Sequence, residues 1–451
     1  MEGPPETISG RRHAETLLLL AALVLAAYAN SFNTGFVLDS APRILDDARV
    51  QAVGPQNLKD ILVHSYWWPE IESGLYRPVT TLSFLVNHAV LDGLDRPAGY
   101  HCVNLLLHAV NAFLVYLLVL HLVRRYWPAF FAAALWALHP IATEAVTNIV
   151  GRSDELAALW VLGALLLYIR STRKTGRAKG RWLAAMMVST ALAVFSKENG
   201  AMVVGLVLLY DFTWRIPRGS SLRAVVAGFR RFFVERYLYL AIPILAMLGA
   251  RWLVLRHSGV ARMAFLDNPL VGADLLTRWA TAIRTSGKYL WPRTLSTDYS
   301  YNQVPLLTWP SATWRDGAAA AAVLGLLAAA VLCYRRSRLG FFRIGFSALT
   351  LLPATSLVVT TGTIMAERLL YLPAAGFAAA LAIGAYRLAH RLGLRPEAAA
   401  VVLSAIGIAY GVRTYRANIS RARKTSPAGK VRDCAPWINS WRCSLVRSDT
   451  R

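Results

Sequence analysis

The sequence predicts an all-α polytopic membrane protein, and three observations lead to this fold class. Of the 451 residues, 56% are hydrophobic and only 16% are charged. Apolar runs of about 17–25 residues, the length that a helix needs to cross a bilayer, recur along the chain. Short clusters of Lys and Arg separate these runs. Because backbone polar groups in lipid must find partners within their own segment, we expect the runs to be helices.

About eleven ranges have the length and composition of membrane spans. They are 14–32, 102–123, 129–148, 154–170, 181–195, 200–214, 237–255, 317–334, 344–360, 368–388 and 397–412. The first range follows Arg11-Arg12-His13 and carries Ala27-Tyr28-Ala29 near its end, a pattern that also fits a cleavable signal. Because the run continues to Phe32, we expect a retained signal anchor.

The basic clusters predict the orientation of these spans. One precedes the first span and the others follow the second, fourth, sixth, eighth and tenth: Arg11 and Arg12; Arg124 and Arg125; Arg170 to Arg181; Arg215 to Arg236; Arg335 to Arg343; Arg387 to Arg395. All of them therefore fall on one side, which the positive-inside rule assigns to the cytoplasm. The net charge of +24 thus fits anionic lipid headgroups and topology control, and we expect no nucleic-acid partner.

The opposite side receives the polar connections of the chain. These are the loop 33–101, the turns 151–155 and 196–200, the loop 256–316, with an interfacial helix expected at 275–292, and the turn 361–368. Charged residues at the membrane are costly and tend to be functional. A transporter would place them near the midplane, so their position favours an enzyme that acts on a lipid-linked substrate from the non-cytoplasmic side. A polytopic transporter is the alternative.

The loop 33–101 is the predicted catalytic loop. Asp39 stands a few residues beyond the first apolar run. A partly desolvated carboxylate suits a general base that deprotonates a hydroxyl, and a solvated loop acid is the alternative. Residues 57–64 and 79–91 have helical apolar spacing, and with the Trp67-Trp68 pair they predict helices that lie on the membrane interface.

Charged residues in the other polar connections are candidates for substrate binding. We expect Arg77, Arg152, Lys197 and Arg368 to receive a phosphate, and Glu144, Asp154, Glu198 and Glu367 to position the substrate, together with His139 beside the helix-breaking Pro140. A solvated arginine is the alternative for Arg77, and a structural hydrogen bond is the alternative for Glu144. A phosphate in this place fits a polyprenyl-phosphate sugar, whose tail would lie in the membrane lipid.

No metal or cofactor is expected. His101, Asn104 and His108 share one helix face, which fits either a metal pair or, as we favour, a polar helix contact. No phosphate-cradling glycine motif, zinc motif or Ser-His-Asp arrangement is present in the sequence.

Taken in order, the motifs over about residues 30–415 resemble those of the transmembrane and tetratricopeptide-repeat O-mannosyltransferases, a family with the GT-C fold. The resemblance rests on Gly35-Phe36-Val37-x-Asp39, Tyr76-Arg77-Pro78, Asn87-His88, Tyr100-His101-x-x-Asn104-Leu105-x-x-His108, His139-Pro140-Ile141-x-Thr143-Glu144, Gly151-Arg152-x-Asp154, Ser196-Lys197-Glu198-x-Gly200, Tyr210-Asp211, Asn268-Pro269, Leu295-Ser296-x-Asp298-Tyr299-Ser300 and Ala366-Glu367-Arg368-x-x-Tyr371-Leu372-Pro373. It implies transfer of mannose from a polyprenyl-phosphate (dolichyl-phosphate) donor to protein Ser or Thr, with inversion. It also implies that the first outer loop supplies the catalytic acid, which Asp39 matches.

Two departures from the family are visible. The family usually has two adjacent acids, and Ser40 stands in the second place. Residues 413–451 show no repeat period, so we expect a GT-C domain over 1–412 and a basic, disordered tail over 413–451, and a bacterial-type member without the repeats. The alternatives are transfer of another lipid-linked sugar to a glycan or lipid, and an inactive scaffold. The membrane would be the plasma membrane in a bacterium and the endoplasmic reticulum in a eukaryote.

Overall fold

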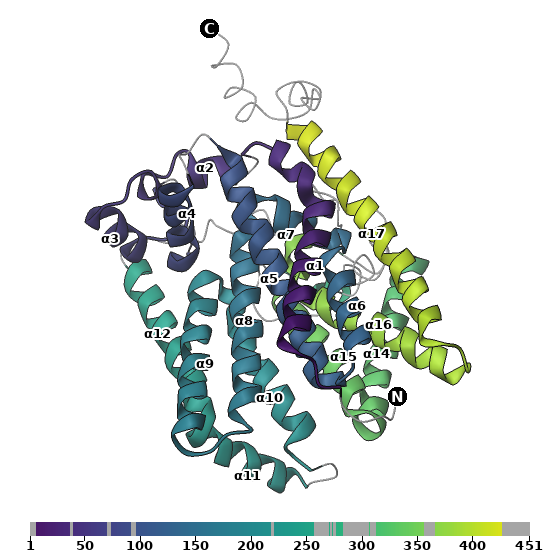
Figure 1. The fold of residues 1–451 in the computed structure, drawn as a ribbon. Coiled ribbons are helices and arrows are strands. Elements are labelled where there is room, and N and C mark those ends of the chain that lie inside the picture. Colours follow the sequence, from purple (N-terminus) through teal and green to yellow (C-terminus); the bar gives the residue numbers. More distant parts are fainter. Residues whose placement is uncertain are drawn as a thin grey trace.

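In the computed structural model the chain is a bundle of helices, with no strand in the part that is described (Figure 1). The described residues are 6–36, 39–69, 74–91, 96–217, 221–256, 270, 273, 277–282, 306, 313–355 and 366–425. Of the predicted interfacial helix at 275–292, only 277–282 are described, and they are helical. The remainder of that range lies outside the described residues.

A helix overlaps each of the eleven predicted spans. These helices are α1 (Gly10–Tyr28), α5 (Pro97–Val123), α6 (Tyr126–Ala137), α8 (Arg152–Ser171), α9 (Gly176–Ser196), α10 (Met202–Trp214), α12 (Leu238–Leu255), α14 (Trp314–Arg336), α15 (Arg338–Leu351), α16 (Pro373–Arg391) and α17 (Pro396–Thr425). Among the described residues, five helical stretches are long and apolar enough to cross a membrane alone, and a bent pair makes a sixth if it is one span. The all-helical membrane fold is therefore confirmed, and the count of eleven crossings stays a prediction.

The third predicted span, 129–148, is not one continuous helix. It is broken after α6 into η3 (Pro140–Ala142) and α7 (Thr143–Thr147), and the two halves are bent by 47°. Pro140 lacks the backbone N–H that would continue the helix. The ring of His139 compensates, since its Nδ1 accepts a hydrogen bond from the backbone N–H of Ile141 (3.2 Å). The helix is thus broken at Pro140, and η4 (Ile149–Gly151) follows α7.

The two ends of the bundle differ in character. The first-loop helices α2 (Ser40–Ile44), α3 (Pro55–Val63) and α4 (Pro78–Val90) lie at the upper end in Figure 1. The basic α11 (Leu222–Phe232) and the chain's N-terminal end lie at the lower end. The α17 helix rises to the upper end and continues to Thr425, so residues 413–425 are helical where the sequence predicted a disordered tail. Residues 426–451 lie outside the described part.

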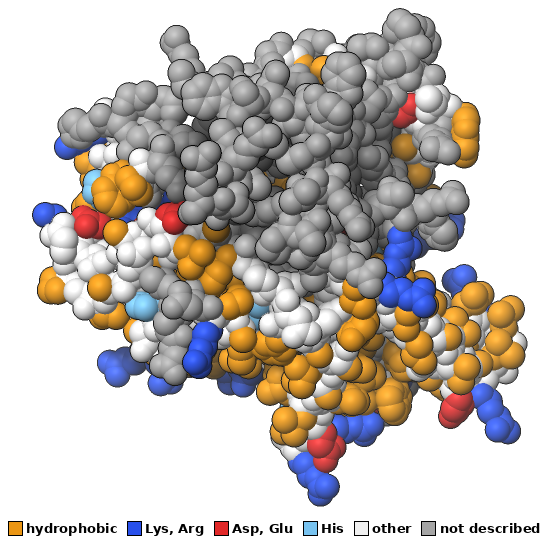
Figure 2. All heavy atoms as spheres, turned by 90° about the horizontal axis from the view of Figure 1, so that it is seen from above, with side chains coloured by type: hydrophobic (Ala, Val, Ile, Leu, Met, Phe, Trp, Pro, Cys, Tyr) orange, Lys and Arg blue, Asp and Glu red, His pale blue; other side chains and the backbone are white. Residues whose placement is uncertain are grey.

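The two helices predicted in the first loop are present as α3 and α4, and their position on the membrane interface stays a prediction. Each begins with a proline, whose fixed φ angle suits the first helical position. Both leave apolar side chains exposed, among them Leu58 and Leu62 on α3 and Val86 and Val90 on α4. Figure 2, which looks down on this end, shows hydrophobic, basic, acidic and His side chains together at the edge where these helices lie. Such a mixed surface suits the membrane interface.

The polar face of α5 makes hydrogen bonds to neighbouring segments of the bundle, which is the polar helix contact that we favoured. His108 donates through Nε2 to the carbonyl oxygen of Ala137, which is left without a helical partner where α6 ends (3.0 Å). The Tyr371 hydroxyl bonds to Nδ1 of His108 (2.8 Å), and His101 bonds to the Thr34 hydroxyl (2.9 Å). Within the described residues no group of three or more His, Cys, Asp or Glu side chains is placed to hold a metal ion.

Two glycines allow close backbone approaches in the turns that precede α8 and α10. A Cβ atom on Gly151 would lie 2.2 Å from the carbonyl oxygen of Ala145. A Cβ atom on Gly200 would lie 2.4 Å from the carbonyl carbon of Ala193. Because both contacts are with backbone, the neighbour cannot move aside as a side chain would. These turns therefore require glycine for space.

We expect Gly151→Ala and Gly200→Ala each to destabilise the protein by about 1–3 kcal/mol, because the added methyl group overpacks the turn. The control is Gly180→Ala in α9, where a Cβ meets nothing within 4 Å and alanine should be neutral or slightly stabilising. Thermal unfolding of the detergent-solubilised variants measures the difference. Equal stability of all three variants would contradict the close approaches.

Candidate functional site

Arg368 connects the first loop to the broken third span. Its Nη1 lies 3.7 Å from Oδ2 of Asp39, and its Nε lies 3.7 Å from Oε1 of Glu144. The backbone N–H of Arg368, in η9 (Glu367–Leu370), donates to the other oxygen of Glu144 (3.1 Å). Burial lowers the pKa of Arg368, but the carboxylates of Glu144, Asp154 and Asp39 outweigh burial and raise it overall. The guanidinium is therefore charged.

Lys197 and Asp154 form a buried ion pair. Lys197 is an extended residue between α9 and η5 (Glu198–Ala201), and Asp154 lies in the first turn of α8. The Nζ atom of Lys197 lies 2.6 Å from each carboxylate oxygen of Asp154. The pKa of Lys197 is lowered to about 8: burial is the largest cause, Asp154 opposes it, and the cations Arg77 and Arg368 add to the lowering.

Arg77 and Glu198 form a third pair beside the first two. Arg77 immediately precedes α4, and its Nε and Nη2 donate to Oε2 of Glu198 at 3.0 and 2.8 Å. Burial acts to raise the pKa of Glu198, but the Arg77 guanidinium overcomes it and the net pKa is lowered. Thr80 of α4 also donates to the carbonyl oxygen of Ser196 (2.8 Å), which fixes the loop against the end of α9.

These pairs form one group, the charge cluster: Asp39, Arg77, Glu144, Asp154, Lys197, Glu198 and Arg368. Charges of Arg77 and Arg368 act on Lys197, and Asp154 acts on both arginines. A small, mostly apolar cavity lies beside the cluster, and its lining includes Asp154, Asn199 and Arg368. Asp39 does not line it but contacts Arg368, which does. Turns far apart in the chain thus meet as the sequence predicted.

Asp39 and Arg368 are the more exposed members of the cluster. Their side chains are 41% and 28% exposed, whereas those of Lys197 and Asp154 are 8% and 3% exposed. The Asp39 carboxylate caps no backbone N–H of α2, although the residue precedes that helix. Its contact with Arg368 is long for an ion pair. Asp39 is therefore available as a proton acceptor, and Arg368 is the cation most available to an anion.

Arg152, which the sequence proposed for phosphate binding, has its hydrogen bonds inside the helix bundle. It is fully buried and donates to the side-chain oxygens of Asn87 (2.7 Å) and Asn104 (2.8 Å). It also donates to the backbone carbonyls of Tyr100 (2.9 Å) and Ser83 (3.2 Å). These bonds join α4, α5 and α8. The geometry supports a role in positioning these helices.

Two further proposed residues lie near the cluster without a contact that is described to it. His139 packs its ring against Tyr410, with centroids 4.7 Å apart, and against Phe377. Glu367 is fully buried at the first position of η9, immediately before Arg368. Their roles in substrate binding stay predictions.

Ser40, which stands where the family has a second acid, is buried in a different environment from Asp39. Its hydroxyl donates to Oδ1 of Asn148 (3.1 Å), at the junction of α7 and η4. Ser40 thus anchors the start of α2 to the third span.

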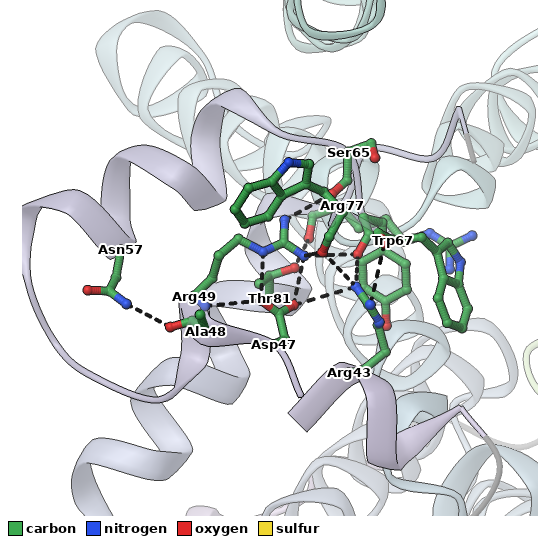
Figure 3. A network of polar contacts seen from close by, with 11 residues as sticks. Arg43, Asp47, Ala48, Arg49, Asn57, Ser65, Trp67, Arg77 and Thr81 are labelled. Carbon is green, nitrogen blue, oxygen red and sulfur yellow. Dashed lines mark hydrogen bonds and ion pairs between the residues drawn. The ribbon is translucent and has the colours of Figure 1, made fainter. Parts of the chain in front are cut away.

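Sequence reasoning missed a buried network that shapes the first loop (Figure 3). Arg43 and Arg49 both contact the Asp47 carboxylate and donate to backbone carbonyls in residues 65–68. The signal in the sequence is an acid flanked by two arginines within seven residues, Arg43 to Arg49. Next to this network lies Tyr66, which the sequence reading also passed over.

The curated relatives of this chain are protein O-mannosyl-transferases. TMTC4 of Mus musculus is 30% identical over 436 residues, which is 86% of this chain and 57% of that protein. TMTC4 of Homo sapiens is 30% identical over 440 residues, 87% of this chain and 58% of that protein. TMTC2 of Homo sapiens is 33% identical over 327 residues, 69% of this chain and 38% of that protein. The chain thus spans little more than half the length of the TMTC4 relatives.

The structural comparison finds archaeal oligosaccharyltransferases. AglB from Archaeoglobus fulgidus, in complex with an inhibitory peptide and a dolichol-phosphate, has a TM-score of 0.48 and 14% identity, and covers 93% of this chain and 59% of its own. The oligosaccharyltransferase of the same organism tethered to an acceptor peptide has a TM-score of 0.49 and 12% identity, and covers 94% and 59%. No family model matches the chain.

We expect Lys197→Met and Asp154→Leu each to destabilise the protein by about 3–5 kcal/mol, because each leaves a buried charge without its partner. The double variant should lose less than the sum, since it removes both charges. Chemical unfolding of the wild type, the two single variants and the double variant measures the coupling free energy between Lys197 and Asp154. The control is Glu15→Ala, which removes the exposed pair with Arg11 and should change stability by less than about 0.5 kcal/mol. Additive losses for the two buried residues would contradict the pairing.

Proposed function

Because the chain is a homologue of the TMTC protein O-mannosyl-transferases over most of its length, we propose that it is an integral-membrane mannosyltransferase. Its donor is a polyprenyl-phosphate mannose and its acceptor is a Ser or Thr hydroxyl of a protein, with inversion at the sugar. One observation carries the assignment of the site: the exposed Asp39 carboxylate lies 3.7 Å from Arg368 within the charge cluster. A general base and a cation for the leaving phosphate are the groups that this transfer requires.

In the proposed reaction, the acceptor oxygen attacks C1 of the mannose from the face opposite the phosphate. The bond between C1 and the acceptor oxygen forms while the bond between C1 and the phosphate oxygen breaks. The bonding electrons leave with the polyprenyl phosphate, and the acceptor proton passes to Asp39. Arg368 extends from Asp39 to the leaving phosphate on the opposite face of the sugar, where its guanidinium stabilises the negative charge that develops.

The other members of the cluster hold this arrangement. Glu144 accepts from the backbone of Arg368 and faces its Nε, so it orients the guanidinium. Lys197 adds positive charge next to the cavity that Arg368 lines, and Asp154 keeps the ammonium in place. Arg77 is held by Glu198 at the edge of the first loop. These carboxylates hold the three cations in fixed positions, from which Arg368 donates to the phosphate.

We assign the site to the non-cytoplasmic side of the membrane. The first-loop helices stand at the end of the bundle opposite the basic α11 (Figure 1), and basic connections mark the cytoplasmic side. The GT-C architecture is part of the same proposal. The membrane is the plasma membrane in a bacterium or the endoplasmic reticulum in a eukaryote. Transfer of another lipid-linked sugar, or transfer to a glycan or lipid acceptor, is the alternative that a panel of donors and acceptors separates.

The direct test supplies polyprenyl-phosphate mannose and a Ser/Thr-containing peptide to the purified protein in nanodiscs and detects an added hexose by mass spectrometry. We expect Asp39→Asn to lower kcat/KM by about 10²–10⁴-fold, because the amide cannot accept the proton. Asp46→Asn, an exposed acid of the same loop, is the control and should leave the rate unchanged. Full activity of the Asp39→Asn protein would refute the role of Asp39.

The pH dependence tests Lys197. Its pKa of about 8 lies below the ordinary value of 10.5, so the ammonium loses its proton as the pH rises through about 8. The uncompensated Asp154 carboxylate then repels the phosphate, and kcat/KM of the free enzyme should fall above about pH 8. Arginine keeps its charge at this pH, so Lys197→Arg should move the alkaline limb upward. If kcat/KM of the Lys197→Arg protein falls at the same pH as that of the wild type, a group other than Lys197 causes the fall.

A further inference from the structure

Tyr66 presents a buried hydroxyl without a partner next to the charge cluster. The residue is 4% exposed, and its hydroxyl has no hydrogen bond within the described structure. The backbone around it is fully bonded, since its N–H donates to the carbonyl oxygen of Leu75 (2.7 Å). A buried polar group that lacks a partner costs free energy, so such groups mark places where a ligand or water completes the site.

Several of the charged residues around Tyr66 are those that we propose for the reaction. The guanidinium of Arg77 lies over its ring at 5.1 Å from the centroid, and that of Arg43 at 5.8 Å. Besides these two cations, the charges of Asp39 and Arg368 act on the hydroxyl. Burial raises the pKa of Tyr66 above 10, so the hydroxyl keeps its proton at neutral pH and can donate a hydrogen bond. A protonated donor beside two arginines suits an anionic oxygen.

The network of Arg43, Asp47 and Arg49 that Figure 3 shows fixes the backbone on either side of Tyr66. Arg49 donates to the carbonyl oxygens of Ser65 (2.9 Å), Tyr66 (3.0 Å) and Trp68 (3.1 Å). Arg43 donates to the carbonyl oxygen of Tyr66 as well. Asp47 binds Nη2 of Arg49 at 2.7 Å, and the side chains of Arg43, Asp47 and Arg49 are 1–2% exposed. Two buried arginines, Arg43 and Arg49, thus fix the backbone on which the Tyr66 side chain stands.

We infer that the Tyr66 hydroxyl donates a hydrogen bond to the phosphate of the lipid-linked donor, between Arg77 and Arg368. This inference rests on the proposed function and deepens it, because it adds a neutral donor to the arginines and lysine that the sequence predicted for the phosphate. The network of Arg43, Asp47 and Arg49 then serves as the positioning device for that contact. Tyr66 is a binding residue, since the proton of the acceptor goes to Asp39.

The test is the affinity of the purified protein in nanodiscs for a polyprenyl phosphate that carries no sugar, measured by ligand-induced thermal stabilisation. Tyr66→Phe removes only the hydroxyl, and because no partner among the described residues is lost, the melting temperature without ligand should stay unchanged or rise. We expect the affinity to fall about tenfold or more, as for a hydrogen bond to a charged group.

Tyr100→Phe is the matched control. Tyr100 is 1% exposed, its hydroxyl also has no partner in the described part of the chain, and Arg152 lies over its ring at 5.5 Å. The groups that act on its hydroxyl do not include Asp39 or Arg368. This variant should bind polyprenyl phosphate as the wild type does.

The outcomes separate the inference from the proposed function. Equal affinity of the Tyr66→Phe and wild-type proteins, an equal loss in the Tyr100→Phe protein, or no binding by the wild type would each overturn the phosphate contact. If Tyr66→Phe alone weakens binding while the wild type transfers no mannose from any donor, the contact stands and the mannosyltransferase assignment fails. If the wild type transfers mannose and Tyr66→Phe binds normally, the assignment stands and the contact fails.

Discussion

Pairing of buried charges is the constraint on which the upper end of this bundle depends. An apolar bundle cannot leave an ion without a partner, so each cation brought to this end fixes the element that carries its partner. Lys197 and Asp154 join the end of α9 to the start of α8. Arg77 and Glu198 join the first loop to the same turn. Gly151 and Gly200 let those turns approach neighbouring backbone closely enough for the pairs to form.

The ion-pair distances in the cluster differ. The short pairs have a structural role, and the long contacts involve the residues proposed for the reaction. The Lys197–Asp154 and Arg77–Glu198 pairs have contacts of 2.6 and 2.8 Å, whereas Arg368 lies 3.7 Å from both of its carboxylates. Three cations in the cluster face four carboxylates, and Glu144 alone also binds the backbone of Arg368. Asp39 is therefore the carboxylate of the cluster that is held least tightly by its partner. A general base needs such a carboxylate, because its oxygen must be free to accept a proton.

Periodicity and composition predicted much of the fold because they report local physics. The apolar runs become helices, α3 and α4 begin within two residues of their predicted starts, and the turns around Asp154, Lys197 and Arg368 meet. The partner that a charged side chain binds depends on the tertiary structure, so the sequence did not predict it. Arg152 reads like Arg368 in the sequence, yet it bonds to two asparagines and two carbonyls within the bundle. Tyr66 was not predicted, because what distinguishes it is a buried hydroxyl that has no hydrogen-bond partner among the described residues, which periodicity does not report.

The geometry at the start of α2 bears on the missing second acid. Asp39 precedes the helix and keeps its carboxylate away from the helix N–H groups, while Ser40, the first helical residue, is buried against Asn148. Adjacent residues at this bend therefore face different surroundings. A carboxylate at position 40 in the same backbone would meet the Asn148 amide in a closed space rather than the contact between Asp39 and Arg368. One base suffices for an inverting transfer, and the proton acceptor proposed here is retained in Asp39. The serine thus anchors the loop to Asn148 and leaves the proposed general base in place.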